Sequence, residues 1–302
     1  MLLDTASLYY RAFFGVPDTV TAPDGAPVNA VRGLLDMIAR LVRARGPARL
    51  VACMDEDWRP AFRVEAVPSY KAHRVAPGGE ADHGEEQTPP ALAPQIPVIR
   101  DVLDAAGIAV AGAPGYEADD VIATLAAGAG QPVDVVTGDR DLFQLVDDER
   151  EIRIVYTVRG LTKLEIVDEH AVAARYGIPG RAYADFATLR GDPSDGLPGV
   201  PGVGEKTAAA LIRAFGSVDA IITALDAGHG GFPTGSRAKL TAARAYLDVA
   251  PAVVRTATDV KLPPVAGDLP MEVADPARLE ELGERWGLGS SLTRFVSAVT
   301  GS

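Results

Sequence analysis

The 302-residue sequence lacks what several protein classes require. It has a single cysteine, Cys53, so no internal disulfide can form. The apolar run Leu50–Met54 around it indicates a buried structural thiol and not a nucleophile. The four histidines are scattered, and we expect them at surface or structural positions and not as metal ligands: His73, His83, His170 and His229.

Long apolar segments are also missing. No run of 18 apolar residues occurs, so the sequence offers no candidate membrane-spanning helix. Asp4 places a charge where a signal peptide needs its apolar stretch. We therefore expect a cytoplasmic protein that makes no membrane contact.

An excess of basic residues is absent. The chain has 29 Lys and Arg against 41 Asp and Glu, which gives a net charge of -12. Nucleic acids favour basic surfaces, so this balance at first argues against such a partner. If the acids converge on divalent cations, however, the bound ions reverse the local field. Net charge therefore neither indicates nor excludes DNA.

The hydrophobic content of 47% is enough for a large core, in one large domain or two modest ones. Short apolar runs predict strands at Met1–Leu3, Leu50–Met54, Ile108–Val110 and Val133–Val136. Amphipathic stretches between them predict helices at Val28–Arg45, Gln95–Ala106 and Tyr116–Ala127. This alternation is typical of an α/β fold with a mainly parallel sheet.

Two other regions differ from this pattern. Ala76–Ala91 is rich in Pro, Gly and Glu and cannot pack a core, and loops of this length are usually functional or disordered. It follows a basic aromatic patch, Arg63–Arg74. From Gly180 onward the pattern is helical, with breaks at Gly228–Gly231 and around Pro263–Pro264.

Carboxylates follow the predicted strands. Ligand sites of parallel sheets lie outside the carboxyl ends of the strands, so these acids are expected at one edge. Taken in pairs they could be helix caps. Together they would repel one another strongly without cations. The strand-end acids are Asp4, Asp55, Glu117, Asp119, Asp120, Asp139 and Asp141, and Asp192 and Asp195 follow later in the chain.

Oxygen ligands without clustered His or Cys select hard ions, which indicates Mg²⁺ or Mn²⁺ and not zinc. Two such ions about 4 Å apart suit in-line displacement at a phosphodiester, because they generate hydroxide and stabilise the developing charge. The sequence therefore suggests metal-assisted phosphodiester hydrolysis.

A glycine-rich turn within Gly191–Ala208 opens a helix at Glu205–Thr207. Such a turn can direct backbone N–H groups at a DNA phosphate, whatever the base. A plain loop before a capped helix is the alternative, and the turn by itself does not decide between them.

Five ordered motifs resemble the 5′ nuclease or flap endonuclease family, found as bacterial stand-alone enzymes and as the N-terminal domain of DNA polymerase I. The stand-alone form is the expected one. The motifs are Leu3-Asp4 with Tyr10–Phe14, Phe62-Arg63 through Tyr70–Ala72, Gly115–Val121, Thr137–Leu142 with Gln144–Val146, and Gly191–Ala208.

The resemblance implies a PIN-like nuclease domain over residues 1–179 with a helical arch or clamp at about 64–98. It implies a helical region over 180–302 with a helix-hairpin-helix at about 185–225. By motif, the ligands of a first metal would be Asp4, Asp55, Glu117 and Asp119. Those around a second, some through water, would be Asp120, Asp139, Asp141, Asp192 and Asp195.

The family also implies roles for cations and for the hairpin. Lys71 and Arg74 would contact the scissile phosphate and, with Asp139 and Asp141, form the catalytic set. Arg63 would bind DNA nearby, and Tyr70 would either stack on a base or pack internally. Backbone contacts to DNA would come from Gly199, Val200, Gly202, Gly204, Lys206 and Thr207. Carbonyls of this turn would hold K⁺, with Ser194 near it.

The activity implied is that of a flap endonuclease and 5′-3′ exonuclease of DNA replication and repair. Such an enzyme leaves a 5′-phosphate and a 3′-hydroxyl. It would use two or more Mg²⁺ or Mn²⁺ ions, act as a nucleoid-associated monomer, and bind branched or gapped duplex DNA with a 5′ flap or 5′ end. The alternatives are a PIN-type ribonuclease and a DNA-junction binding module whose acids are only helix caps.

Overall fold

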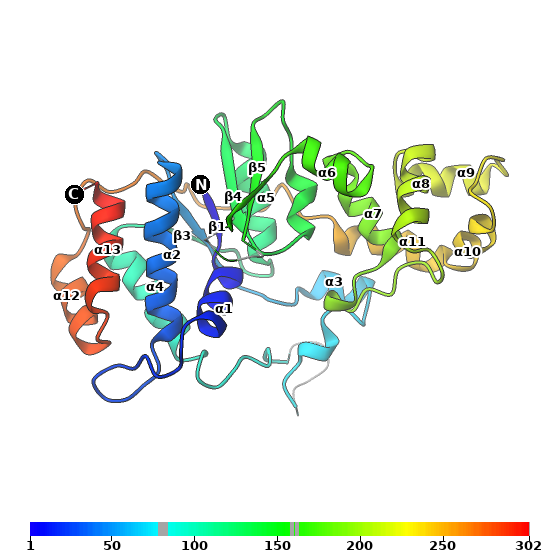
Figure 1. Ribbon diagram of the computed structural model, residues 1–302. Coiled ribbons are helices and arrows are strands. Elements are labelled where there is room, and N and C mark those ends of the chain that lie inside the picture. Colours follow the sequence, from blue (N-terminus) through cyan, green and yellow to red (C-terminus); the bar gives the residue numbers. More distant parts are fainter. Residues whose placement is uncertain (78–83, 158–159, 161–162, 302) are drawn as a thin grey trace.

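A six-stranded sheet forms the centre of the structure (Figure 1). The computed structural model describes residues 1–77, 84–157, 160 and 163–301. His83 and the middle of the segment Ala76–Ala91 lie outside the described residues.

The strands lie in the order β3-β2-β1-β4-β5-β6. All neighbouring strands are parallel except β5 and β6, which are antiparallel, so the predicted mainly parallel sheet is confirmed. β1 is the centre, with Leu3 opposite Ala52 on one side and Val136 on the other. The strands are β1 (Leu2–Asp4), β2 (Val51–Cys53), β3 (Ala109–Ala111), β4 (Val133–Thr137), β5 (Ile152–Tyr156) and β6 (Glu165–Val167).

One face of the sheet is covered by helices from both ends of the chain: α1 (Thr5–Gly15), α2 (Asn29–Arg45), α4 (Gln95–Ala106), α12 (Pro276–Arg285) and α13 (Gly289–Thr300). α2 and α13 lie side by side in Figure 1. Phe295 of α13 is fully buried in the same core as Leu34 and Ile38 of α2. Arg294 forms an ion pair with Asp36 at 2.8 Å at the edge of this contact.

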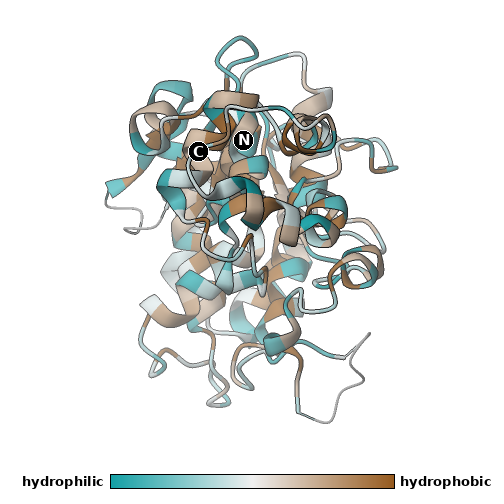
Figure 2. Ribbon diagram, turned by 90° about the vertical axis from the view of Figure 1, so that its right-hand side faces the viewer, coloured by the Kyte–Doolittle hydropathy of each residue, from teal (hydrophilic) through white to brown (hydrophobic). Residues whose placement is uncertain are grey.

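The other face carries α5 (Ala118–Gly128) and the 3-10 helix η2 (Asp141–Leu145). A buried aromatic cluster of Phe143, Tyr176, Tyr183 and Phe186 joins this layer to the helical region. That region contains α6 (Glu169–Tyr176), η4 (Gly180–Ala182), α7 (Tyr183–Arg190), η5 (Pro193–Asp195), α8 (Glu205–Phe215), α9 (Val218–Asp226), α10 (Ser236–Ala242) and α11 (Arg244–Val254). In Figure 2, hydrophilic segments lie mainly on outer loops and outward helix faces.

The division expected at residue 180 stays a prediction, and the chain beyond it does not form a single layer. After α11 the chain returns to the sheet, where the Leu50 amide donates to the Gly267 carbonyl at 2.7 Å. α13 then packs against α2 and α12 against α4, and both share the core of these helices (Figure 1). The helical region as a separate layer therefore ends near Val254, and the last helices belong to the nuclease layer.

The arch expected at about 64–98 contains little helix in its described part. α3 (Ala61–Ala66) ends within it, η1 (Ala72–Arg74) adds one short turn, and α4 begins at Gln95. Between them Val75 and Glu86 form an isolated antiparallel bridge. The described residues of this segment are thus mostly turns and irregular structure, which agrees with their Pro and Gly content.

Among the described residues, no single helix has the length and apolarity needed to cross a membrane. By length and composition alone α8 and α9 pass together, as a pair bent by 74°.

We predict that Phe295→Ala lowers the free energy of unfolding by about 3–5 kcal/mol, because it leaves a cavity between α13 and α2. Phe14→Ala is the matched control, since Phe14 is 74% exposed and its loss should change stability by less than about 0.5 kcal/mol. Urea denaturation measures both. Equal costs would contradict the assignment of α13 to the core.

Candidate metal and nucleic-acid site

A cleft of about 380 Å³ lies at the carboxyl edge of the parallel strands. Seven acidic and three basic side chains line it. Six of the nine carboxylates expected from the sequence are among them, and Asp141 and Asp195 adjoin it through their contacts. The lining acids are Asp4, Asp55, Glu86, Glu117, Asp119, Asp139 and Asp192, and the bases are Lys71, Arg74 and Arg140.

Asp4 stands at the end of β1 and caps α1, since its Oδ1 accepts from the Ser7 amide at 3.0 Å. Its Oδ2 accepts from the Thr137 hydroxyl at 2.6 Å. Burial raises the pKa of Asp4 to about 7. Asp55 follows β2 and accepts from the Ala118 amide at 2.8 Å, and burial raises its pKa to about 6. These two acids are therefore fixed by backbone amides at helix starts.

Asp119 and Asp141 are strongly perturbed. Burial raises the pKa of each well above its ordinary value, and the neighbouring charge of Asp139 raises both further. Asp139 accepts from the Asp141 amide at 2.8 Å. Asp141 Oδ1 is buried without a hydrogen-bond partner among the described residues. A buried carboxylate oxygen without a donor is what a metal-binding position presents before a cation is bound.

The turn after α7 supplies two more acids. Asp192 accepts from the Ser194 amide at 2.9 Å and from the Ser194 hydroxyl. Asp195 accepts from Arg74 Nη2 at 2.9 Å, and the same nitrogen donates to the Ser194 carbonyl at 2.7 Å. Burial raises the pKa of Asp195. Arg74 therefore fastens this turn to the start of the arch.

Lys71 enters the cleft from a constrained backbone. Its φ is 47°, in the left-handed region that side chains other than glycine seldom adopt. Its amide donates to the Asp195 carbonyl at 2.8 Å, and its ammonium contacts Glu117 Oε1. Burial would lower the pKa of Lys71, but the charge of Glu117 outweighs this and raises it well above its ordinary value. Such backbone strain persists where surrounding contacts hold the residue in place.

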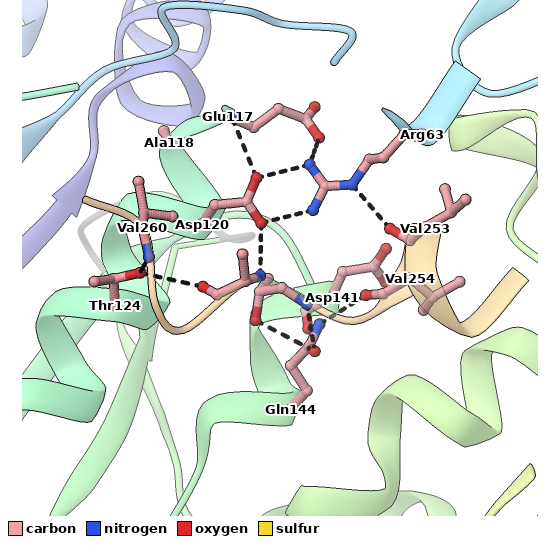
Figure 3. Close-up of polar contacts among 12 residues, drawn as sticks. Arg63, Glu117, Ala118, Asp120, Thr124, Asp141, Gln144, Val253, Val254 and Val260 are labelled. Carbon is pink, nitrogen blue, oxygen red and sulfur yellow. Dashed lines mark hydrogen bonds and ion pairs between the residues drawn. The ribbon is translucent and has the colours of Figure 1, made fainter. Parts of the chain in front are cut away.

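Arg63, Tyr70 and Asp120 lie behind the cleft (Figure 3 shows Arg63 and Asp120). Arg63 and Tyr70 are only 2% and 4% exposed, and Asp120 is fully buried. Asp120 is paired with both terminal nitrogens of Arg63 at 2.7 Å, and Tyr70 donates to Glu117 at 2.7 Å. The structure thus places Arg63 and Tyr70 inside the protein and not on a DNA-facing surface, and it turns Asp120 away from the cleft.

The hairpin between α7 and α8 is divided into an inner and an outer half. Gly199 and Val200 are buried, and a Cβ added to Gly199 would lie 2.4 Å from the Gly191 amide nitrogen. Close packing of the chain therefore explains these glycines. Gly202, Gly204 and Lys206 are exposed, Thr207 is half-buried, and Gly204 is the N-cap of α8.

The carbonyl of Gly202 accepts from Lys239 Nζ of α10 at 2.8 Å. Ser194, expected near the hairpin cation, lines the acidic cleft and bonds Asp192.

Sequence reasoning missed several residues of the site. Thr137 bonds Asp4 and accepts from the Asp139 amide at 2.8 Å. Glu86 reaches the cleft from the arch segment and accepts from the Tyr10 hydroxyl at 3.3 Å. Thr137 lies two residues before Asp139 in a motif that the sequence analysis identified, so its role could have been inferred from that motif. Glu86 lies in a segment without periodicity, so no pattern pointed to it.

The donors fit a hard divalent cation in chemistry, because they are carboxylate oxygens, several carry raised pKa values and Asp141 Oδ1 has no partner. In the described part of the chain, no three His, Cys, Asp or Glu side chains are arranged so that they could hold an ion directly. Lys71 and Arg74 instead lie against Glu117 and Asp195. Binding therefore requires these side chains to move.

Comparison with known proteins identifies the class. A family model described as the 5′-3′ exonuclease N-terminal resolvase-like domain matches residues 1–177. A second, the 5′-3′ exonuclease C-terminal SAM fold, matches residues 178–277. The chain belongs to the 5′-3′ exonuclease family, which confirms the resemblance drawn from its motifs.

Particular relatives support the assignment. A 5′-3′ exonuclease of Streptomyces coelicolor is 59% identical over 300 residues, which cover 99% of this chain and 100% of the relative. A 5′-3′ exonuclease of Mycobacterium tuberculosis is 52% identical over 310 residues, 99% of this chain and 97% of the relative. The DNA polymerase I of Bacillus subtilis is 37% identical over 229 residues, 75% of this chain and 24% of the polymerase.

Solved structures share the fold. The T5 5′-exonuclease with divalent metal ions (zinc) bound is 18% identical, with a TM-score of 0.64 over 100% of this chain and 98% of that one. The catalytic core of Rad2 in complex with DNA substrate is 19% identical, with a TM-score of 0.61 over 98% and 91%. The helical C-terminal region and mixed α/β architecture are thereby confirmed.

We predict that Gly196→Ala destabilises the protein more than its backbone angle alone requires. Gly196 has a φ of 70°, and an added Cβ would lie 2.1 Å from the Ser69 carbonyl oxygen. Gly216→Ala is the control, because Gly216 has a φ of 90° and nothing within 4 Å of an added Cβ. Chemical denaturation should give a cost of about 1–2 kcal/mol for the control and at least about 3 kcal/mol for Gly196→Ala. The same loss of stability in both variants would rule out the close contact between Gly196 and Ser69.

Proposed function

We propose that the protein is a divalent-metal-dependent nuclease that cleaves DNA at 5′ flaps and degrades it from 5′ ends. The observation that carries this proposal is the meeting of seven acids with Lys71 and Arg74 in one cleft. A hydrolase of phosphodiesters needs negative ligands for cations and positive groups for the scissile phosphate side by side. Family membership agrees with this reading.

The bound ions would be two or more Mg²⁺ or Mn²⁺, supplying an activated water and charge stabilisation at the reacting phosphate. Asp4, Asp55, Glu117 and Asp119 would hold the first ion. Asp139, Asp141, Asp192 and Asp195 would surround the second. Asp120 supports this set from behind by fixing Arg63.

Lys71 and Arg74 would act on the substrate. Both are now paired with carboxylates of the cleft, at Glu117 and Asp195. An arriving phosphate offers each cation a competing anionic partner, so the two side chains can move from carboxylate to phosphate oxygen. The products would carry a 5′-phosphate and a 3′-hydroxyl.

Duplex DNA would be held by the outer half of the hairpin. The exposed N-terminal turn of α8 presents backbone amides at Gly204 and Lys206, and the Lys206 ammonium lies on the same turn. Lys239 adds a second cation at Gly202. A K⁺ ion at this turn would have to share the Gly202 carbonyl with Lys239. Recognition through the backbone favours shape over sequence, which suits branched or gapped duplexes with a 5′ flap or 5′ end.

The protein would act as a monomer, because one chain supplies all the residues that line the cleft. Its place of action would be the nucleoid in the cytoplasm, where its DNA substrates lie.

We predict that Asp139→Asn lowers the rate of 5′-flap cleavage in Mg²⁺ at least about 100-fold, because a metal-site oxygen is replaced by an amide. Asp134→Asn is the control from the same region of chain. Asp134 lies on β4, pairs with Arg45 and is outside the cleft. A labelled flap substrate gives both rates. Cleavage by Asp139→Asn at the parent rate would refute the proposed site.

The same substrate panel separates the alternatives. A PIN-type ribonuclease would cut single-stranded RNA faster than flap DNA. A junction-binding module would bind flap DNA tightly without cutting it.

We also predict that Mn²⁺ raises the melting temperature of the metal-free protein by about 5 °C at an ion concentration 100 times the dissociation constant. The ions would relieve repulsion among the cleft acids. Asp119→Asn should reduce this rise by at least half, whereas Asp134→Asn should preserve it. Differential scanning fluorimetry with and without EDTA gives the values, and no rise in the parent would exclude ion binding at the cleft.

A further inference from the structure

Every nitrogen of the buried Arg63 guanidinium has an acceptor (Figure 3). Nη1 donates to Glu117 Oε2 at 2.5 Å and to Asp120 Oδ2 at 2.7 Å. Nη2 donates to Asp120 Oδ1 at 2.7 Å, and Nε donates to the Val253 carbonyl at 3.0 Å. A planar guanidinium makes these four hydrogen bonds from three separate nitrogens, whereas a lysine ammonium carries its three donors on one nitrogen and cannot reproduce the bidentate fork.

These bonds make the two oxygens of Glu117 unequal. Oε2 faces inward, where it accepts from Arg63 and from the Tyr70 hydroxyl at 2.7 Å. Oε1 faces the other way and contacts the Lys71 ammonium, which lines the cleft. Arg63 and Tyr70 therefore fix the rotation of this carboxylate, and only one of its oxygens is left for a ligand in the cleft.

Arg63 is itself held by a distant part of the chain. The Val253 carbonyl belongs to the last turn of α11, where helix carbonyls lack internal partners and the helix dipole favours a cation. Asp120 Oδ1 also accepts from the Ala257 amide at 2.8 Å just beyond this turn. Gln144 bonds the Asp141 carbonyl at 2.8 Å and the Val254 carbonyl at 3.1 Å. The end of α11 thus supports both acid-bearing elements, α5 and η2.

We propose that Arg63, seated on the end of α11 and backed by Tyr70, is a positioning residue that sets the affinity of the cleft for its divalent ion by orienting Glu117. It does not touch DNA. This inference rests on the proposed metal-dependent function, and it assigns Arg63 a role other than the DNA contact expected from its place in a basic patch.

The test measures Mn²⁺ binding to the 302-residue protein in the absence of DNA by isothermal titration calorimetry. Arg63→Lys keeps the charge but loses the fork, so Mn²⁺ binding should weaken about 10- to 100-fold, as when other supports of metal ligands are removed. The affinity for duplex DNA in EDTA should change less than twofold. Unchanged Mn²⁺ affinity in folded Arg63→Lys would overturn the proposal.

Arg255→Lys is the matched control. Arg255 directly follows α11 and bonds Asp185 at 2.7 Å and Asp219 at 2.9 Å, which are not cleft residues. It should bind Mn²⁺ like the parent. If it weakens Mn²⁺ binding as much as Arg63→Lys does, loosening of the α11 end explains the effect and the proposal falls.

A double-mutant cycle with Glu117→Gln tests whether Arg63 affects Mn²⁺ binding through Glu117. If Arg63 acts through Glu117, Arg63→Lys should weaken Mn²⁺ binding less than twofold further in the Glu117→Gln protein. An undiminished further loss would contradict that route. Should Arg63→Lys not fold, Tyr70→Phe removes the other donor to Oε2 and should weaken Mn²⁺ binding severalfold, and an unchanged affinity would overturn the proposal. Absence of Mn²⁺ binding by the parent would instead refute the proposed function.

Discussion

Repulsion among carboxylates at one edge of the sheet is the constraint on which the structure depends. Parallel strands end at a common edge, where Asp4 ends β1 and where Asp55 and Asp139 each lie two residues beyond the ends of β2 and β4. Seven acidic side chains line a cleft with three basic ones, and burial raises several carboxyl pKa values. Such a cluster persists only where amides, internal cations or bound ions compensate it.

Two kinds of contact within the protein compensate the repulsion among these carboxylates. Backbone amides hold Asp4 and Asp55 at the starts of α1 and α5. Buried or half-buried cations hold Asp120 and Glu117, through ion pairs with Arg63 and Lys71. Arg63 is buried behind the cleft, whereas Lys71 lines the cleft itself. The same excess of acid that gives the chain its net charge of -12 thus includes the carboxylates that we propose bind its ions.

The helical region is joined to the cleft by this electrostatic framework. Arg74 ties the acidic turn after α7 to the start of the arch, and carbonyls at the end of α11 accept hydrogen bonds from Arg63 and Gln144. A duplex held at the exposed start of α8 would therefore lie at a fixed distance from the acids. Asp192, Asp195 and the hairpin lie in one stretch of chain. This stretch is the shortest connection between the cleft and the helical region.

Much of this could be predicted from the sequence. Strands β1 to β4 were recognisable because each is a short apolar run, and the carboxyl-edge rule then brought the acids together. β5 and β6 carry no site residues, and Arg153 and Glu165 interrupt their apolar character, so they were missed. The return of α12 and α13 to the sheet was missed because their amphipathic pattern shows a buried face but not its partner.

The roles of individual site residues were harder to predict from the sequence. A basic aromatic patch suggests a surface, and the burial of Arg63 depends on the carbonyl of Val253, 190 residues away in the chain. The family motif predicts a DNA contact at Gly199, whereas close packing against Gly191 explains why a glycine stands there. The contact of Lys239 with Gly202 joins separate helices. The contacts of Arg63 with Val253 and of Lys239 with Gly202 join residues far apart in the chain, which the spacing within a motif does not encode.

The most direct test of the central claim, that the acidic cleft is a site for divalent cations, is a crystal structure of the protein soaked with Mn²⁺ and measured at the manganese absorption edge. The account predicts anomalous peaks within about 2.2 Å of carboxylate oxygens in the cleft, with Lys71 withdrawn from Glu117 and Arg63 still in place. An absence of anomalous peaks in a cleft with its acids ionised, or peaks only elsewhere on the surface, would contradict it.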